Sequence, residues 1–287
     1  MLIQLLSVLV SNANLKSFLT KSIYSGKTKS LCQPGLNCYS CPLAVASCPV
    51  GAFQAAVNSR KFSFSFYVTG FISLIGLLAG RLVCGYLCPF GFIQDLLFKI
   101  PLAKIRTRGK FDRILRFLKY IVLLLFVILI PIFVADRFGN GFPAFCKYIC
   151  PAGTLEGAVG LLAHPVNTDK FSMLGQLFTQ KFLILTVTLT ACVFIYRAFC
   201  RFLCPLGAIY GLFARIALLG IRVEESQCSG CGACLRICPM DVRRVGDHEC
   251  IHCGLCMDAC PEKAISIKVG KIVLKGPELP AVRRNVP

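Results

Sequence analysis

A repeated cysteine–proline–glycine unit constrains this chain more than any other feature of its sequence. Complete copies with the pattern Cys-x3-Cys-Pro-x-Gly occupy residues 84–91, 146–153 and 200–207, and a shorter Cys-Pro-x-Gly copy occupies 48–51. Two thiols four residues apart lie on one side of a helical turn, so each complete unit can offer two soft ligands to one metal centre. The proline then blocks continuation of the helix, and the glycine lets the backbone approach a cofactor closely.

The composition indicates a polytopic membrane protein with metal–thiolate sites. Hydrophobic residues make up 56% of the 287 residues, and the mean hydropathy is +0.70, which excludes an ordinary soluble domain. The 19 cysteines would indicate disulfides in a short secreted protein. This chain is long, however, and we expect no cleavable signal at its start. Metal binding therefore explains the cysteines better.

The formal net charge of +19 has two explanations within this interpretation. Basic residues collect at the cytoplasmic flanks of membrane helices, and iron–sulfur clusters held by four thiolates are anionic, which the formal count ignores. A nucleic-acid-binding function is set aside, because the basic residues accompany no recognition motif. The sequence also has no Walker loop, dinucleotide fingerprint, serine triad or paired catalytic carboxylates, so we expect no catalytic residues.

Three apolar stretches predict membrane-spanning helices at about 62–80, 118–135 and 180–197. Residues 1–15 are apolar but short for a span of roughly 20 residues, so they predict either a short tilted span or an interfacial helix. Residues 151–163 predict a short re-entrant or interfacial helix. The expected membrane domain covers 1–221, a C-terminal domain covers 222–268, and 269–287 form a tail.

The basic residues predict a multi-pass orientation in the cell (inner) membrane. Eight Lys or Arg residues and one acidic residue lie between 99 and 119, a density typical of a cytoplasmic loop. The second helix would begin after this loop. Three crossings then place the cysteines at 84–88 and 200–204, together with the C-terminal domain, on the cytoplasmic side. The cysteines before residue 62 and at 146–150 fall on the outer side.

The same order of units predicts an internal repeat. Each half, about 38–98 and 146–212, contains an outer unit, a helix and an inner unit, so a pseudo-two-fold axis along the membrane normal should relate the halves. The inner units pool enough thiols for one [4Fe–4S] cluster: Cys84, Cys88, Cys200 and Cys204. Buried structural cysteines are the alternative. The nearby Arg81, Arg197 and Arg201 could pair with an anionic cluster or extend to the membrane interface.

The outer units pool six thiols, from which a second cluster can be built: Cys32, Cys38, Cys41, Cys48, Cys146 and Cys150. By symmetry with the inner set, we favour Cys41, Cys48, Cys146 and Cys150, with Cys38 as the first replacement. A disulfide is the alternative if the outer compartment is oxidising. Cys192 has no partner by spacing and is expected to be a packing residue. His164 is expected to be structural rather than a haem ligand.

The C-terminal cysteines form two runs with identical spacing: Cys228-x2-Cys231-x2-Cys234-x3-Cys238-Pro239 and Cys250-x2-Cys253-x2-Cys256-x3-Cys260-Pro261. Over about 225–268 this pattern resembles the bacterial two-cluster ferredoxin, with a small α+β fold. The resemblance implies that the fourth cysteine of each run crosses to the other cluster. Cys228, Cys231, Cys234 and Cys260 would hold one cubane, and Cys250, Cys253, Cys256 and Cys238 the other. Zinc knuckles are the alternative. His248 and His252 could tune the potential or be merely exposed.

Over about 62–268 the chain resembles the membrane-bound polyferredoxins of the NapH/NosR type. The resemblance is carried by Cys84, Cys88 and Pro89, by Cys200, Cys204 and Pro205, and by the eight C-terminal cysteines. It implies electron transfer to or from a quinol pool or a partner respiratory enzyme. Compared with that pattern, we expect no extracytoplasmic flavin domain, and the chain carries the extra outer thiols. These departures put a purely nitrate or nitrous-oxide role in doubt.

The expected fold is thus a polytopic α-helical membrane domain with an internal parallel repeat, plus a small α+β two-cluster ferredoxin domain. The expected function is that of an electron-transfer subunit of an oxidoreductase complex rather than an enzyme by itself. Two [4Fe–4S] clusters in the ferredoxin domain and one inner and one outer cluster would carry electrons. Its partners would be other redox subunits, the lipid bilayer and quinone or quinol. A quinone-reactive subunit and a redox sensor or maturation factor remain alternatives.

Overall fold

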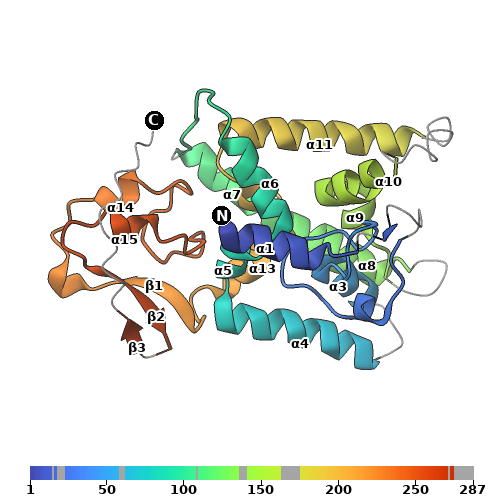
Figure 1. Cartoon of the computed structure of the whole chain (residues 1–287), viewed down its shortest axis with the longest axis horizontal. Coiled ribbons are helices and arrows are strands. Elements are labelled where there is room, and N and C mark those ends of the chain that lie inside the picture. The colour runs from blue at the N-terminus through green and yellow to red at the C-terminus, as the bar shows by residue number, and fades with distance from the viewer. Residues whose placement is uncertain are drawn as a thin grey trace.

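Helices make up most of the described chain, and a small sheet lies in its C-terminal part. The computed structural model describes residues 1–14, 16–17, 23–57, 62–107, 109–135, 141–162, 175–270 and 272–274. His164 and residues 275–287 of the expected tail lie outside these ranges. Figure 1 shows the C-terminal unit at one end of the long axis, beyond the ends of the long helices.

The helices of the N-terminal half are α1 (Leu2–Ser11), the 3-10 helix η1 (Lys27–Ser30), α3 (Pro49–Val57), α4 (Phe62–Ala79), α5 (Leu82–Tyr86), α6 (Pro89–Phe98) and α7 (Lys110–Val122). The π-helix η2 (Leu123–Leu129) and α8 (Ile130–Phe133) continue α7. They are followed by α9 (Ala144–Tyr148), the π-helix η3 (Gly153–Val159), α10 (Gly160–Leu162), α11 (Gln176–Phe194), α12 (Ala198–Phe202) and α13 (Pro205–Phe213).

Helices occur at all three positions where the sequence predicts spans. Among the described residues, Lys110–Phe133 and Gln176–Phe194 are long and apolar enough to cross a membrane, whereas the apolar stretch Phe66–Ala79 of α4 is shorter. The second helix begins at Lys110 rather than near residue 118, so part of the basic segment interpreted as a loop is helical. Figure 1 shows α4 and α11 both ending toward the C-terminal unit, and α7 beginning there.

The first helix packs against the interior instead of standing apart. Helix α1 has 10 residues, about half the length that a span requires. Gln4 Nε2 donates to Asp95 Oδ2 at 2.6 Å, and Ser7 Oγ donates to the carbonyl oxygen of Leu87 at 2.9 Å. These bonds fix α1 to α5 and α6, next to the second Cys-Pro-x-Gly unit.

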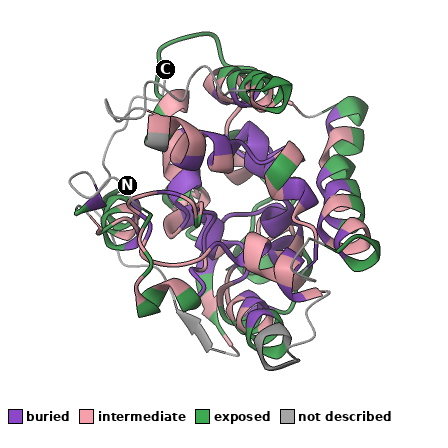
Figure 2. Cartoon of the chain, turned by 90° about the vertical axis from the view of Figure 1, so that its right-hand side faces the viewer, coloured by how far each residue is buried: buried purple, intermediate pink, exposed green. Residues whose placement is uncertain are grey.

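The buried residues lie among the short helices, and the long helices surround them. Figure 2 shows buried segments at the centre of the molecule and exposed ones on the peripheral helices. Only 28% and 17% of the most apolar windows of Lys110–Phe133 and Gln176–Phe194 are buried. The cysteines of the Cys-Pro-x-Gly units are buried except for the half-buried Cys146, while apolar side chains of the long helices face outward.

A three-stranded antiparallel sheet organises the C-terminal unit. Its strands are β1 (Leu219–Val223), β2 (Ile265–Val269) and β3 (Ile272–Leu274), in the order β1-β2-β3. Leu219 pairs with Val269, and Val223 pairs with Ile265. The sheet begins at Leu219, slightly before the predicted boundary at 222. The 3-10 helix η5 (Glu225–Gln227), α14 (Ala233–Arg236) and α15 (Leu255–Asp258) lie between β1 and β2.

Candidate metal centres

The Cys-Pro-x-Gly units share one local geometry. Cys88 and Cys204 are the N-cap residues of α6 and α13, with proline following in the first turn. Their sulfur atoms accept hydrogen bonds from the backbone N–H of Gly91 and Gly207, both at 3.4 Å, and Cys150 accepts one from Gly153 at 3.3 Å. A helix N-terminus favours negative charge, so these sulfur atoms are placed to act as thiolates.

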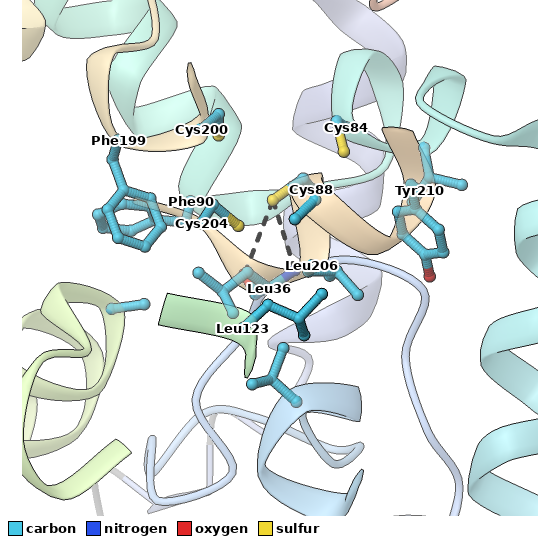
Figure 3. Packing of buried hydrophobic residues seen from close by; sticks show 14 of the residues in the cluster. Leu36, Cys84, Cys88, Phe90, Leu123, Phe199, Cys200, Cys204, Leu206 and Tyr210 are labelled. Atoms are coloured by element: carbon cyan, nitrogen blue, oxygen red, sulfur yellow. Dashed lines mark hydrogen bonds between the residues drawn. The ribbon is translucent and has the colours of Figure 1, made fainter. Parts of the chain in front are cut away.

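The inner set, defined as Cys84, Cys88, Cys200 and Cys204, is brought together by α5, α6, α12 and α13. All four residues are buried in one core cluster. Figure 3 shows the four side chains projecting from different segments into one region. Cys204 is a direct neighbour of Cys200, and Cys88 has both Cys200 and Cys84 as neighbours. The four inner thiols predicted from the repeat are therefore neighbours.

Two fully buried arginines border the inner set. Arg81 Nη2 donates to the carbonyl oxygen of Cys200 at 3.2 Å, and Arg197 Nη1 donates to the carbonyl oxygen of Cys84. Arg81 and Arg197 are 0% and 1% exposed, so neither extends to an interface. Arg81 Nε is buried and has no hydrogen-bond partner within the described part of the chain. A buried N–H donor without a partner is available to donate to an anionic group.

The outer thiols group differently from the favoured prediction. The space beside two glycines shows which sulfur atoms are close. A Cβ on Gly51 would lie 3.7 Å from Cys146 Sγ, and one on Gly153 would lie 3.7 and 3.8 Å from the sulfur atoms of Cys150 and Cys38. Cys146 and Cys150 both interact electrostatically with Cys48 and Cys38. We call Cys38, Cys48, Cys146 and Cys150 the outer set.

Cys41 and Cys32 also lie near this set, as neighbours of Cys38 and Cys48 respectively, but each makes a contact of its own. Cys41 Sγ lies 3.8 Å from Asn12 Oδ1, to which it donates. The backbone N–H of Cys32 donates to the hydroxyl oxygen of Tyr67 at 3.0 Å. The geometry therefore favours Cys38, the replacement considered from the sequence, over Cys41 as the fourth member of the outer set. Spacing alone favoured Cys41 because that residue is nearer along the chain to Cys48.

Two buried glutamines were missed by the sequence analysis. Gln54 Nε2 lies 3.3 Å from Cys146 Sγ, and Gln94 Nε2 lies 3.0 Å from Cys200 Sγ. Each is the sixth residue after the cysteine of a Cys-Pro pair, Cys48 or Cys88, and that shared position was the available signal. Cys192, predicted to be a packing residue, is buried and donates from Sγ to Gln94 Oε1 at 3.4 Å.

The eight C-terminal cysteines form two groups that follow the crossed ferredoxin pattern. Burial and the neighbouring thiols Cys250, Cys253 and Cys238 raise the pKa of Cys256 to about 12. Burial also raises the pKa of Cys234, which has Cys260 and Cys228 as neighbours. The group of Cys250 is the more buried, whereas Cys228 and Cys231 are exposed. The structure thus gives one group facing outward and one facing the helices.

The C-terminal unit is fixed to the helical part by a buried ionic cluster, defined as Arg81, Lys119 and Glu249. Arg81 Nη1 lies 2.6 Å from Glu249 Oε2, and Lys119 Nζ contacts Glu249 Oε1. Burial alone would raise the pKa of Glu249, but the two cations hold it at about 2. All three side chains are 2% exposed or less. Because water does not reach these charges, each is stabilised by its oppositely charged partner.

Two close backbone contacts connect the thiol groups. The carbonyl oxygen of Ile251 would lie 2.6 Å from a Cβ on Gly85, so the chain beside Cys250 touches the chain beside Cys84. The backbone N–H of Leu36 donates to Cys88 Sγ at 3.4 Å, and Leu36 lies only two residues before Cys38. Figure 3 shows Leu36 directly beside Cys88, with the hydrogen bond drawn.

These arrangements fit iron–sulfur cubanes better than single metal ions. Within the described ranges, no three His, Cys, Asp or Glu side chains are grouped so that they could hold one metal ion. In a [4Fe–4S] cluster each thiolate binds a different iron atom, so four thiols surround a volume instead of converging on a point. Backbone N–H donors to the sulfur atoms and buried cations beside them suit an anionic cluster.

Comparison with known proteins agrees with this chemistry. A family model described as a 4Fe-4S binding domain matches residues 47–67, 64–108, 119–166 and 182–223, which together exceed half of the chain. A second model with the same description matches 221–244 and 247–266. No solved structure matches the chain.

Several curated proteins are similar over part of this chain. An uncharacterized protein of Methanocaldococcus jannaschii is 26% identical over 61% of this chain and 58% of its own length. The methylamine utilization ferredoxin-type protein MauN of Methylobacillus flagellatus is 27% identical over 60% of this chain and 52% of its own. The ferredoxin-type protein NapH of Escherichia coli K12 is 26% identical over 58% and 51%.

The chain spans about half the length of the curated relatives it matches. The resemblance predicted from the cysteine motifs is confirmed by the two family models and by the ferredoxin-type relatives. The chain belongs to the 4Fe-4S binding domain family, and it resembles the NapH-like polyferredoxins.

Proposed function

We propose that this protein is a membrane-embedded electron conductor with four [4Fe–4S] clusters in a row. Bound clusters would supply the one-electron redox chemistry. The chain would hold them, exclude water and connect them. The observation that carries this proposal is the pair of backbone contacts, Ile251 with Gly85 and Leu36 with Cys88, because each links two neighbouring thiol groups.

The proposed ligand sets follow the thiol groups of the structure. The two C-terminal clusters would have Cys228, Cys231, Cys234 and Cys260, and Cys238, Cys250, Cys253 and Cys256 as ligands. The inner set would hold a third cluster, and the outer set, with Cys38 instead of Cys41, a fourth. The support for Cys38 is its position beside Gly153 and Gly157, where a Cβ would lie 3.8 and 3.4 Å from its sulfur atom.

The membrane placement is supported by the outward-facing side chains. Phe66 on α4, Phe111 on α7 and Phe133 on α8 are 74%, 73% and 80% exposed. Apolar surface of this extent is unusual for a soluble monomer and typical of contact with lipid. In the proposed topology three helices cross the cell membrane, the C-terminal unit is cytoplasmic, and the two halves of the repeat are related by a pseudo-two-fold axis.

The proposed order of clusters runs from the exposed C-terminal group to the outer set. Cys228 and Cys231 are exposed and would face a soluble redox partner. Cys250 and Ile251 are buried against Gly85. From Cys88, the chain Leu36–Asn37–Cys38 reaches the outer set. This internal route would shorten the distance across a hydrocarbon core of about 30 Å.

Electron flow through the protein can be measured in sealed lipid vesicles. The full-length protein is reconstituted with ferricyanide trapped inside, the orientation is checked by protease access to the C-terminal unit, and dithionite is added outside. We expect wild type and Cys41→Ala to reduce the trapped ferricyanide and Cys38→Ala to lose most of that rate. If wild type conducts no faster than protein-free vesicles, or Cys38→Ala matches wild type, the proposed conductor is wrong.

A cavity favours a second candidate function, a quinone-reactive subunit. Its volume is about 870 Å³, within the range of ligand sites, and it lies between α7, α13 and the C-terminal unit. Its walls include Phe117, Tyr120 and Leu212 together with Arg113 and Arg215. The cavity also borders Glu249, the neighbour of Cys250. An aromatic wall next to polar donors suits a ring that carries oxygen atoms.

Anaerobic titration with a quinol tests this candidate. Oxidation of a quinol releases two electrons and two protons, so cluster reduction should follow quinol addition. Leu212→Trp would narrow the cavity at its wall and should weaken reduction by quinol but not by dithionite. Leu218→Trp, exposed outside the cavity wall, is the control. No reduction of wild type by quinol would exclude the candidate.

A further inference from the structure

Gln54 and Gln94 occupy equivalent positions in two different units. Each lies in the helix that starts with the proline of its unit, Gln54 in α3 and Gln94 in α6. Both side chains are 0% exposed. Burying a carboxamide requires hydrogen-bond partners for both its donors and its acceptor. The partners of these two side chains are therefore informative.

The orientation of each carboxamide is set by backbone groups. Gln54 Oε1 accepts from the N–H of Phe145 at 3.0 Å, and Gln94 Oε1 accepts from the N–H of Cys200 at 3.4 Å. Because an N–H can only donate, the oxygen must face it, and the Nε2 group must point the other way. The assignment of nitrogen and oxygen thus follows from the network in both residues.

Both amide hydrogens of each side chain have a partner. Gln54 Nε2 lies 3.2 Å from the carbonyl oxygen of Val50 and 3.3 Å from Cys146 Sγ. Gln94 Nε2 lies 3.3 Å from the carbonyl oxygen of Phe90 and 3.0 Å from Cys200 Sγ. In each case one hydrogen is bonded one turn back in the helix, and the other is donated to a sulfur atom contributed by the other half of the chain.

An N–H group that donates to a ligand sulfur favours the reduced cluster. Reduction adds negative charge, which the positive end of the N–H dipole stabilises, so hydrogen bonds to the sulfur atoms raise the reduction potential. The effect is strong where water is excluded. At both positions the donor is buried and its orientation is fixed by neighbouring backbone.

We propose that Gln54 and Gln94 are potential-setting residues, Gln94 for the inner cluster through Cys200 and Gln54 for the outer cluster through Cys146. This inference rests on the cluster assignment under Proposed function. It adds that the two membrane clusters are tuned separately, each by one carboxamide. The chain can therefore adjust the driving force between inner and outer clusters by one residue at a time.

The test is a redox titration of anaerobically purified full-length protein, followed by electron paramagnetic resonance. The signal missing from Cys204→Ala identifies the inner cluster, and the signal missing from Cys150→Ala identifies the outer one. Gln94→Met and Gln54→Met keep an unbranched side chain of similar length but remove the N–H donor. Each variant serves as the control for the other. Iron content is measured on the same samples.

We expect Gln94→Met to shift only the inner midpoint to a more negative potential, and Gln54→Met to shift only the outer midpoint. Full iron content with unchanged midpoints would overturn the inference, because the glutamines would then only position ligands. If a Met variant does not assemble, Gln→Asn, which retains the amide but is too short to reach the sulfur, should give the same shift. Wild-type protein without inner and outer signals would instead contradict the proposed function.

Discussion

Arg81 and Arg197 make reciprocal hydrogen bonds across the inner set. Arg81, three residues before Cys84, donates to the carbonyl oxygen of Cys200, and Arg197, three residues before Cys200, donates to the carbonyl oxygen of Cys84. Each arginine thus belongs to one unit and binds the other. These two hydrogen bonds connect the segment of Cys84 with the segment of Cys200 beside the inner thiols.

Removing one of these buried charges should destabilise the protein. Arg197 Nε lies 2.6 Å from Asp95 Oδ1, so Arg197→Met leaves the Asp95 carboxylate with Gln4 as its remaining side-chain donor among the bonds described above. Breaking a buried pair costs about 3–5 kcal/mol. We expect a clearly lower thermal midpoint in detergent solution. The double variant Arg197→Met/Asp95→Asn should recover part of the loss. A double variant no more stable than Arg197→Met would contradict this.

Glu249 should control the attachment of the C-terminal unit. Glu249→Gln leaves Arg81 and Lys119 close together without a compensating charge, a cost of about 3–5 kcal/mol for a buried pair. We expect faster hydrogen exchange at the contact around Ile251 and Gly85, and faster proteolysis before β1. Glu262→Gln, an exposed residue of the same unit, is the control. Equal exchange in both variants would show that the ionic cluster does not hold the unit.

Gly85→Ala should separate the C-terminal unit from the inner set. The new Cβ would lie 2.6 Å from the carbonyl oxygen of Ile251, a backbone atom, so the two segments must move apart. We expect slower electron transfer from the C-terminal clusters to the inner cluster, measured by rapid-mix freeze-quench spectroscopy, with iron content unchanged. Gly70→Ala meets no atom within 4 Å and is the matched control. If Gly85→Ala transferred electrons as fast as Gly70→Ala, the contact between Gly85 and Ile251 would not lie on the electron-transfer route.

Gly35→Ala should interrupt the next step. Its Cβ would lie 2.7 Å from Cys88 Cα and 2.9 Å from the carbonyl oxygen of Leu87, which would displace the segment that carries Leu36. We expect normal reduction of the inner cluster and delayed reduction of the outer cluster in the same freeze-quench experiment. Delay at both clusters would point to general misfolding, and no delay would mean that electrons take another path.

The sequence was informative where chemistry depends on spacing along the chain. Spacing predicted that Cys84, Cys88, Cys200 and Cys204 gather, because each pair is local and the same Cys-x3-Cys-Pro-x-Gly unit recurs. It did not favour Cys38, because the position of Cys38 beside Gly153 and Gly157 is a contact between distant segments. Gln54 and Gln94 were missed for the same reason, since their sulfur partners lie in the other half of the chain.

Helix boundaries show a similar limit. The basic residues between 99 and 119 suggested a loop, yet α7 begins at Lys110. Asp112 pairs with Arg116 at 2.7 Å and with Arg201 at 3.1 Å. These ion pairs let a charged first turn remain helical while packing on α12. Hydropathy reports the average polarity of the segment and does not include such tertiary partners.

The most direct test of the four-cluster account is the content of iron and acid-labile sulfide in anaerobically purified, full-length protein. Because each [4Fe–4S] cluster contains four iron atoms, we predict about 16 iron atoms per chain for wild type and Cys41→Ala, and about 12 for Cys38→Ala. A wild-type value of about 8 would confine iron to the C-terminal unit and contradict the account. Equal loss in the Cys38 and Cys41 variants would contradict the assignment of the outer set.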